Sequence, residues 1–339
     1  MRELLSLRDG REWDQRSTDW FFCELEPSRC LAWLAWDGAR PIGVTSVYVR
    51  TLALERREWR VGYWANLFVH PDYGNRMLYP RLPLAMQQGS RRAGLDFLYG
   101  SIRRQDVADA HLKIGWGEVG TVNVLIKPLR PASLVAKHLS LGRIVRALGV
   151  PLDAVFRLFP ERSWRGTAKK LAVEPLSCHD VDALVDGLNR GASGQVAQRW
   201  THEGWRERFR QTREGGQYFS FASRAGDLPS GAVVGRVAIR GEGIRAGVVM
   251  DVIANSDREE DAVPALLTAE RRAYREGAEA MLFLDGLGPE LGGIVRRLGY
   301  RASRETYRTI VWPKTVLAER PELADVARWR FAFADHDAF

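Results

Sequence analysis

The chain has 339 residues, about twice the usual length of a single domain, so two domains are expected. With 45% hydrophobic and 27% charged residues, its composition is that of a globular protein, which excludes a disordered or collagen-like chain. No uninterrupted apolar run approaches the roughly 18 residues of a membrane-spanning helix, and the first residues lack the pattern of a signal peptide. Three cysteines without CxxC or Cys/His spacing predict neither a disulfide framework nor a zinc site. A cytoplasmic protein is therefore expected.

The net charge of +8 is concentrated in one stretch of the chain. Residues 128–170 contain nine basic and only two acidic side chains, so a uniformly basic nucleic-acid-binding face is not predicted. Apolar residues at helical spacing alternate with these cations, which indicates one or two amphipathic helices interrupted at Gly149 and Pro151. We expect residues 131–170 to be a connector packed between two domains. The alternatives are contact with an anionic membrane surface, and binding of a carrier protein or tRNA.

Two segments of the chain have the same predicted order of elements. In the first half (residues 30–129), strands are predicted at 31–36, 42–50 and 60–69, a helix at 82–92 and a strand at 95–99. In the second half (residues 218–313), the corresponding ranges are 218–223, 233–239, 247–254, 262–275 and 281–284. A further helix and a last strand follow in each half.

Four residues of the first half match residues of the second half at nearly the same separation along the sequence. The matched pairs are Asn66 and Asp251, Gly94 and Gly277, Gly115 and Gly299, and Pro128 and Pro313, and their separations are 185, 183, 184 and 185 residues. This period is too long for a solenoid and indicates a duplicated domain.

Strands followed by helix, strand, helix and strand predict the α+β class, with two tandem domains that each contain a mostly antiparallel sheet flanked by helices. The expected limits are 1–130 for the first domain, 131–170 for the connector, 171–315 for the second domain and 316–339 for a C-terminal helix and tail.

Residues 67–78, LFVHPDYGNRML, resemble the GNAT acyltransferase superfamily, in which the fourth strand ends in V-x-P-x-[YF] before a pyrophosphate-binding loop. Residues 111–116, HLKIGW, are similar to the Y-x-K-L-G-F ending of the same fold. The resemblance covers residues 30–129 well and residues 218–313 more weakly. It implies two tandem GNAT domains, of which the second is degenerate.

The resemblance implies that the first domain binds acetyl-CoA or another acyl-CoA as a substrate. Pantetheine would pair with the strand end, and the pyrophosphate would meet backbone N–H groups of the following loop; the matching positions are Phe68, Val69, Gly74, Asn75, Arg76 and Met77. The family loop has the pattern R-G-x-G-x-G/A, whereas in residues 74–79 of this chain only Gly74 is a glycine. The loop of the second half, residues 255–261, contains four acidic side chains that repel a pyrophosphate, so acyl-CoA is expected in the first domain only.

Three residues are predicted to be catalytic. His111 stands where the family has a tyrosine that donates a proton to the leaving thiolate, and an imidazole can donate or accept a proton. The alternative is a polar helix residue that faces solvent. Asn66 occupies the position of the family's carboxylate base, where an amide can orient a water or an amine but cannot deprotonate it.

Asp251 is the counterpart of Asn66 in the second half and lies inside an apolar run. It is a candidate base that would reach His111 across a cleft between the domains; the alternative is a carboxylate on a solvated strand face. The carboxylates of residues 335–337 are further candidates for the same cleft. No metal is predicted, because three adjacent residues rarely converge on one ion.

These features together predict an acyl-CoA-dependent N-acyltransferase that acts on an amine of a small molecule or a peptide. One alternative is tRNA-dependent aminoacyl transfer, as in the Fem-type enzymes that also resemble paired GNAT domains; the basic connector and the poor pyrophosphate loop favour it. The other is a non-catalytic protein that uses the duplicated fold to bind a partner.

Overall fold

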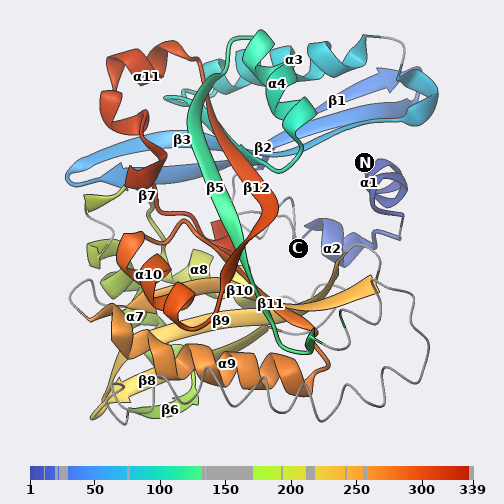
Figure 1. Ribbon diagram of the computed structural model, residues 1–339. Coiled ribbons are helices and arrows are strands. Elements are labelled where there is room, and N and C mark those ends of the chain that lie inside the picture. The colour runs from blue at the N-terminus through green and yellow to red at the C-terminus, as the bar shows by residue number, and fades with distance from the viewer. Residues whose placement is uncertain are drawn as a thin grey trace. The chain divides into compact units, whose positions relative to one another are not determined.

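The computed structural model describes residues 1–10, 12–19, 22, 30–74, 77–131, 134, 171–191, 194–210, 218–240, 243–254 and 258–335 (Figure 1). Nearly all of the predicted connector 131–170 lies outside the described residues, as do Asn75 and Arg76. In this part of the chain, no helix combines the length and the apolar character needed to cross a membrane.

The described residues form two compact units, each assembled from both halves of the sequence. Unit 1 contains residues 1–122, 193–208 and 307–329, and unit 2 contains residues 123–192, 209–306 and 330–339. Both units have the α+β architecture predicted from the sequence.

In unit 1, five strands are hydrogen-bonded in the order β1-β2-β3-β4-β12. Only the pair β3/β4 is parallel, and the short strand β7 pairs with β2. Helix α3 packs along β1, β2 and β3, helix α4 contacts β4, and helix α1 contacts β2 and β3 (Figure 1). The elements are α1 (Arg2–Asp9), α2 (Gln15–Asp19), β1 (Cys30–Asp37), β2 (Arg40–Leu54), β3 (Arg57–Val69), α3 (Leu78–Arg92), β4 (Leu98–Ile102), α4 (Gln105–Lys113), β7 (Ala197–Gln198), α8 (His202–Arg210, whose last two residues lie in unit 2) and α11 (Thr315–Glu319).

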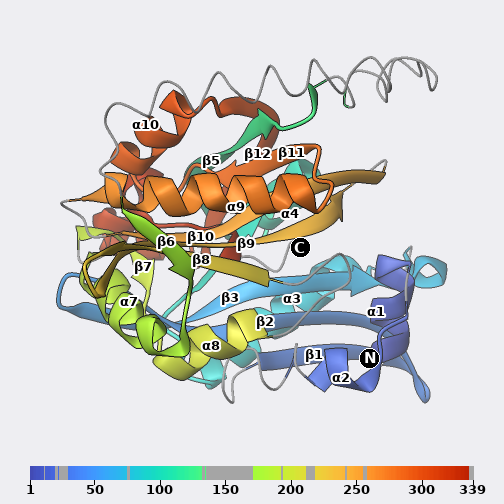
Figure 2. The ribbon, with the colours of Figure 1, turned by 90° about the horizontal axis from the view of Figure 1, so that it is seen from below.

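In unit 2, six strands follow the order β5-β11-β10-β9-β8-β6, and only β10/β11 is parallel. Helices α9 and α7 cover opposite faces of this sheet (Figure 2). Helix α9 buries Leu266, Ala269 and Ala273, which recur every three or four residues and therefore share one face of the helix. The elements are β6 (Ala172–Pro175), α7 (Cys178–Gly191), β8 (Tyr218–Ala225), β9 (Leu228–Arg240), β10 (Ile244–Ala254), α9 (Val263–Arg275), β11 (Ala280–Leu284) and α10 (Pro289–Arg297). Two strands are divided: β5 (Gly117–Pro128) belongs to unit 2 from residue 123, and β12 (Arg301–Trp312) belongs to unit 1 from residue 307.

The last strands of the two halves are exchanged. In the first half β5 follows α4, yet its residues 124–128 pair with β11 in unit 2. In the second half β12 follows α10, yet its residues 308–312 pair with β4 in unit 1. Each unit is therefore completed by a strand from the other half of the sequence, and each exchanged strand is antiparallel to its new neighbour.

Ion pairs join the exchanged strands to the elements that receive them. In unit 2, Lys127 of β5 donates to Glu270 of α9 with a nitrogen–oxygen distance of 2.6 Å, and both side chains are buried. In unit 1, Arg308 of β12 binds Asp109 of α4 and Glu118 at the start of β5. A buried pair that loses one partner leaves an uncompensated charge, so the Lys127–Glu270 pair favours the observed position of β5.

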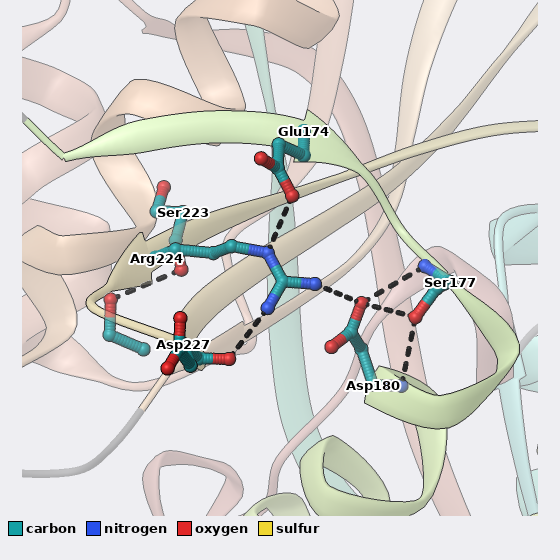
Figure 3. Close-up of polar contacts among 7 residues, drawn as sticks. Glu174, Ser177, Asp180, Ser223, Arg224 and Asp227 are labelled. Atoms are coloured by element: carbon teal, nitrogen blue, oxygen red, sulfur yellow. Dashed lines mark hydrogen bonds and ion pairs between the residues drawn. The ribbon is translucent and has the colours of Figure 1, made fainter.

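A cluster of polar side chains joins β6 and the start of α7 to β8 in unit 2 (Figure 3). Arg224 of β8 contacts Glu174 at 2.9 Å and Asp180 at 2.6 Å. Ser177 and Asp180 also exchange hydrogen bonds between side chain and backbone, which is a capping box at the N-terminus of α7. These bonds and the arginine hold the pKa of Asp180 below its usual value even though burial raises it. The carboxylate therefore stays charged and anchors the helix.

One predicted strand of the first half is displaced. The sequence predicts it at residues 95–99, whereas β4 covers Leu98–Ile102. Asp96 accounts for part of the shift, because its backbone N–H donates to the carbonyl of Arg60 and its side chain accepts from the N–H of Arg60. These bonds fix a turn just before the strand begins.

Candidate active site

In unit 1, strand β3 separates from β4 at a defined point. Gly62 and Tyr63 pair with Leu98 and Tyr99, and both strands then continue without further pairing. On its other edge β3 pairs with β2 as far as Val69, with a β-bulge at Ala65. A bulge bends a strand and increases its twist, so it explains why β3 turns away from β4. Among the described strands, none pairs with the edge of β3 that faces β4 beyond Tyr63, and we call the space beside it the unit 1 gap.

Three aromatic rings surround His111 of α4 at the unit 1 gap. The ring of His111 lies 4.1 Å from that of Trp64, 5.4 Å from that of Trp116 and 6.1 Å from that of Tyr79, measured between ring centroids. His111 is fully buried, so the alternative of a solvent-facing polar residue is wrong. Trp64 comes from the bulged strand and Tyr79 from the first turn of α3, so three elements place these rings.

The hydrogen bonds of His111 fix its tautomer. Its Nδ1 lies 2.8 Å from the carbonyl oxygen of Val107, which can only accept, so Nδ1 carries the proton. Its Nε2 is buried and has no hydrogen-bond partner among the described residues. Burial lowers the pKa of His111, and the bond to Val107 opposes that shift only in part. The residue is therefore a neutral imidazole at pH 7 with an accepting lone pair on Nε2, which is the form of a base.

The amide of Asn66 is held at both ends. Its Oδ1 accepts from Arg8 of α1, and its Nδ2 donates to Ser46 of β2 at 2.8 Å. Its backbone oxygen accepts from Thr45 and from the indole of Trp64. Both polar ends of this side chain thus bind protein groups, and its predicted role in orienting a substrate remains a prediction.

The predicted donor-binding residues follow the bulge along the chain. Phe68 and Val69 end β3 on the part of the strand that is paired only with β2. Gly74 follows a short 3₁₀ turn and is exposed. Met77 is 67% exposed and has a left-handed backbone conformation with φ 55°, which glycine adopts more easily.

The N-terminus of α3 follows Met77 directly. The backbone N–H groups of Leu78 and Tyr79 belong to the first turn, where a helix leaves them without internal partners. Pro80 contributes no N–H. The site therefore fits a pyrophosphate with fewer donors than a helix start that lacks proline.

Unit 2 repeats the strand geometry of unit 1. The β10/β11 pairing ends at Val248 and Leu282, and β10 has a bulge at Met250. These positions lie 185, 183 and 185 residues after Tyr63, Tyr99 and Ala65. The duplication predicted from the sequence thus extends to the residue at which each strand bulges and separates. We call the space between β10 and β11 the unit 2 gap.

The C-terminal segment, residues 330–335, occupies the unit 2 gap. Arg330 donates to the carboxylate of Asp251 at 2.6 Å and to the carbonyl oxygen of Val252 at 3.0 Å, both on β10. The next residue, Phe331, donates its backbone N–H to the carbonyl of Gly286, just beyond β11, at 2.7 Å. The side chains of residues 331–335 are buried. A ligand that ran along β10 would have to displace this segment.

Asp251 is 1% exposed, so the alternative of a carboxylate on a solvated strand face is wrong. Burial raises its pKa, and the charge of Arg330 opposes that rise. Its approach to His111 remains a prediction, because the two residues belong to different units. Asp335 accepts from the backbone N–H of Ala332 at 2.6 Å and so caps a local turn, whereas residues 336–339 lie outside the described residues.

Sequence reasoning missed three contributors to these sites. Tyr79 has no predicted role in the sequence, although its hydroxyl is buried and lacks a partner among the described residues. Arg8 and Arg330 bind residues that are 58 and 79 positions away in the chain, and no local pattern reveals such pairs. In the described residues, no group of three or more potential metal ligands occurs.

Comparison with solved structures reveals the fold. No family model and no curated protein sequence matches the chain. A GCN5-related N-acetyltransferase from Anabaena variabilis is 10% identical, with a TM-score of 0.62 over 91% of this chain and 68% of that one. Saccharomyces cerevisiae N-myristoyltransferase with bound myristoyl-CoA is 12% identical, with a TM-score of 0.61 over 89% and 74%. A protein from Enterococcus faecalis described as a probable N-acyltransferase is 8% identical, with a TM-score of 0.63 over 94% and 71%.

The chain has the fold of GNAT proteins, in the α+β form with mostly antiparallel strand pairing and flanking helices that the sequence predicts. At such low identity the likeness defines the fold and leaves the chemistry to the residues of this chain.

Proposed function

We propose that this protein is an acyl-CoA-dependent N-acyltransferase whose donor binds in unit 1. The observation that carries the proposal is the unit 1 gap. Its bulged, half-paired strand leads to a helix N-terminus, and the buried His111 of α4 lies beside it with an Nε2 that has no hydrogen-bond partner among the described residues. A thioester donor needs groups for each of its parts. The free edge of β3 suits the amide groups of pantetheine, and the first turn of α3 suits the pyrophosphate.

In this proposal His111 acts as a base. Its Nε2 accepts a proton from the acceptor amine while the amine nitrogen forms a bond to the thioester carbonyl carbon, and the carbon–sulfur bond breaks. Tyr79 supplies a proton to the departing sulfur. His111 then releases the proton it took from the amine to solvent, and Tyr79 takes one up from solvent, so that both residues return to their starting forms. Burial and the negative charge of Asp106 raise the pKa of Tyr79, so its hydroxyl is protonated at neutral pH and available to donate. The products are an amide and free CoA.

Unit 2 takes no donor in this proposal. Its gap is filled by residues 330–335, and Glu259, Glu260 and Asp261 precede α9 where an anionic pyrophosphate would lie. One acyl-CoA per chain is therefore expected.

Calorimetric titration with CoA and acetyl-CoA tests the donor site. We expect one bound molecule per chain, and Arg81→Glu, next to the first turn of α3, weakens binding about tenfold because it replaces a cation with an anion near the pyrophosphate. Arg92→Glu, at the other end of the same helix, is the matched control and leaves binding unchanged. Absence of CoA binding, or equal effects of the two variants, would contradict the proposal.

A second candidate function is tRNA-dependent aminoacyl transfer. The left-handed Met77 and the missing N–H at Pro80 favour it, because both weaken a pyrophosphate site. Gel-shift titration with aminoacyl-tRNA separates the two functions. Binding that falls steeply with salt, together with no response to CoA, would replace the first proposal by the second.

A further inference from the structure

Trp64 lies at the narrow end of the unit 1 gap. The last paired residues of β3 and β4 are Tyr63 and Tyr99, so Trp64 and Gly100 are the first residues beyond the pairing. A Cβ atom added at Gly100 would lie 3.2 Å from Cε3 and 3.6 Å from Cβ of Trp64. The tryptophan side chain therefore spans from one strand to the other where they separate.

Hydrogen bonds and ring contacts hold this indole in place. Its Nε1 donates to the backbone oxygen of Asn66 at 2.9 Å and lies 3.2 Å from the hydroxyl of Thr45. The ring also packs against those of His111 and Trp116 and is 8% exposed. Rotation of the indole out of the gap would break both polar contacts inside a packed cluster and leave a buried N–H without a partner, which is unfavourable. The indole therefore acts as a fixed wall.

If acyl-CoA binds as proposed above, the position of Trp64 limits the space for the acyl group of the donor. A donor whose pyrophosphate lies at the start of α3 and whose pantetheine follows the free edge of β3 runs from Val69 towards Tyr63. Its thioester end then meets the narrow end of the gap. We infer that Trp64 limits the acyl group to short chains such as acetyl, and that long-chain acyl donors are excluded by contact with the indole.

Calorimetric titration with CoA, acetyl-CoA and octanoyl-CoA, the last below its micellar concentration, tests the inference. For the unmodified protein, we expect CoA and acetyl-CoA to bind with similar affinity and octanoyl-CoA to bind at least about tenfold more weakly. In Trp64→Leu the order reverses, because each additional methylene that becomes buried contributes a factor of about four, or about 0.8 kcal/mol.

Trp312→Leu is the matched control. Trp312 belongs to the same hydrophobic cluster and is also 8% exposed, but it stacks on Arg91 and pairs with Leu98, which lies before the point at which β3 and β4 separate. Trp312→Leu should leave the preference for short acyl chains unchanged, although it destabilises the fold about as much as Trp64→Leu does. Trp64→Phe, which keeps an aromatic ring, is the second variant if the leucine variant fails to fold, and it should admit hexanoyl-CoA before octanoyl-CoA.

The outcomes separate the inference from the proposed function. If CoA binds and the unmodified protein takes octanoyl-CoA as tightly as acetyl-CoA, or if Trp64→Leu and Trp312→Leu change chain-length preference equally, Trp64 does not set the acyl length and the donor site stands. If CoA binds to none of the proteins, both the donor site and the inference are overturned.

Discussion

The unit 1 gap and the unit 2 gap have the same backbone geometry but different contents. In both units a β-bulge follows the last residues that pair with the parallel neighbour, and a polar residue follows the bulge. In unit 1 that residue is Asn66, and a cluster of aromatic rings with one histidine lies beside it. In unit 2 it is Asp251, and the C-terminal segment lies between the strands.

In each unit, an arginine from a terminal segment binds the polar residue after the bulge. Arg8 of the N-terminal helix donates to Asn66, and Arg330 of the C-terminal segment donates to Asp251. The charges differ, however. Arg8 is already paired with Asp9 at 2.6 Å and faces a neutral amide, whereas Arg330 faces a carboxylate buried in the core. Under the proposed function, the duplicated strand geometry serves a reaction in one copy and holds a chain end in the other.

The largest expected effect is on catalysis in unit 1. We expect His111→Gln to lower kcat about 10²–10⁴-fold, because a glutamine amide cannot accept a proton from the amine. The Kd for acetyl-CoA should change by less than about threefold, since the imidazole is assigned to the acceptor amine and not to the donor. Steady-state kinetics and calorimetry measure the two quantities.

The second half supplies the control for this variant. Val295 occupies the position of His111 there and is buried in the unit 2 core. Val295→Ala should lower the free energy of unfolding without changing kcat of the folded protein. Unchanged kcat in His111→Gln, or a comparable loss in both variants, would remove His111 from the mechanism.

The pH dependence should report the same residue. Burial lowers the pKa of His111 below its usual value of 6.5, so the imidazole stays neutral and active at pH values where an exposed histidine is already protonated. Activity should fall below an apparent pKa that is itself lower than 6.5. Stability should follow the same direction, because the unfolded chain binds the proton more readily: it decreases as the pH drops through 6.5 towards the folded pKa. An activity profile with an acidic limb above 6.5 would argue against His111 as the base.

The next effect is on stability and separates the two arginines. Removal of one partner of a buried ion pair leaves an uncompensated charge and costs about 3–5 kcal/mol, which is the expectation for Arg330→Ala in unit 2. Arg8→Ala should cost only about 1–2 kcal/mol, because it leaves a neutral amide oxygen without a donor. Urea denaturation monitored by circular dichroism measures both.

A further pair of variants sharpens this result. Asp251→Asn converts the unit 2 residue into the residue of unit 1, and in the Arg330→Ala background it should recover part of the lost stability because the buried charge is gone. If Arg330→Ala costs no more than Arg8→Ala, the C-terminal segment does not hold the unit 2 gap closed.

The sequence predicted the duplication and most elements, because these depend on local periodicity and on turn residues at matched spacing. Gly115 and Gly299, for example, both have positive φ, at 93° and 97°, in the turn before the last strand of each half. The exchange of β5 and β12 was not predictable from such patterns. Both last strands are apolar and pair in the antiparallel direction, so their local sequence does not decide whether β5 pairs with β4 or with β11. That pairing depends on long-range contacts such as the ion pair of Lys127 with Glu270.

The candidate site was predicted in outline for a similar reason. His111 and Asn66 stand at positions that a short motif locates, but their environment comes from distant segments: Trp64 from β3, Tyr79 from α3 and Arg8 from α1. Burial of His111 and Asp251 could not be decided from the sequence, because a single polar residue in an apolar run fits either face of an element.

The smallest effect concerns how the chain enters the two equivalent helices. Helix α3 begins after Met77 in a left-handed conformation with φ 55°, whereas α9 begins after Ala262 with φ −78°. A residue with a side chain pays about 1–2 kcal/mol in the left-handed region, and glycine loses about 0.5–1 kcal/mol through its greater freedom in the unfolded chain. Met77→Gly should therefore stabilise unit 1 by up to about 1 kcal/mol, while Ala262→Gly should destabilise unit 2. Thermal denaturation measures both, and because Met77 is mostly exposed, no packing loss offsets the gain.

Glycine also lets the backbone before α3 approach an anion more closely, so Met77→Gly should bind CoA more tightly as well. A more stable protein with weaker CoA binding would mean that the methionine side chain itself contacts the donor.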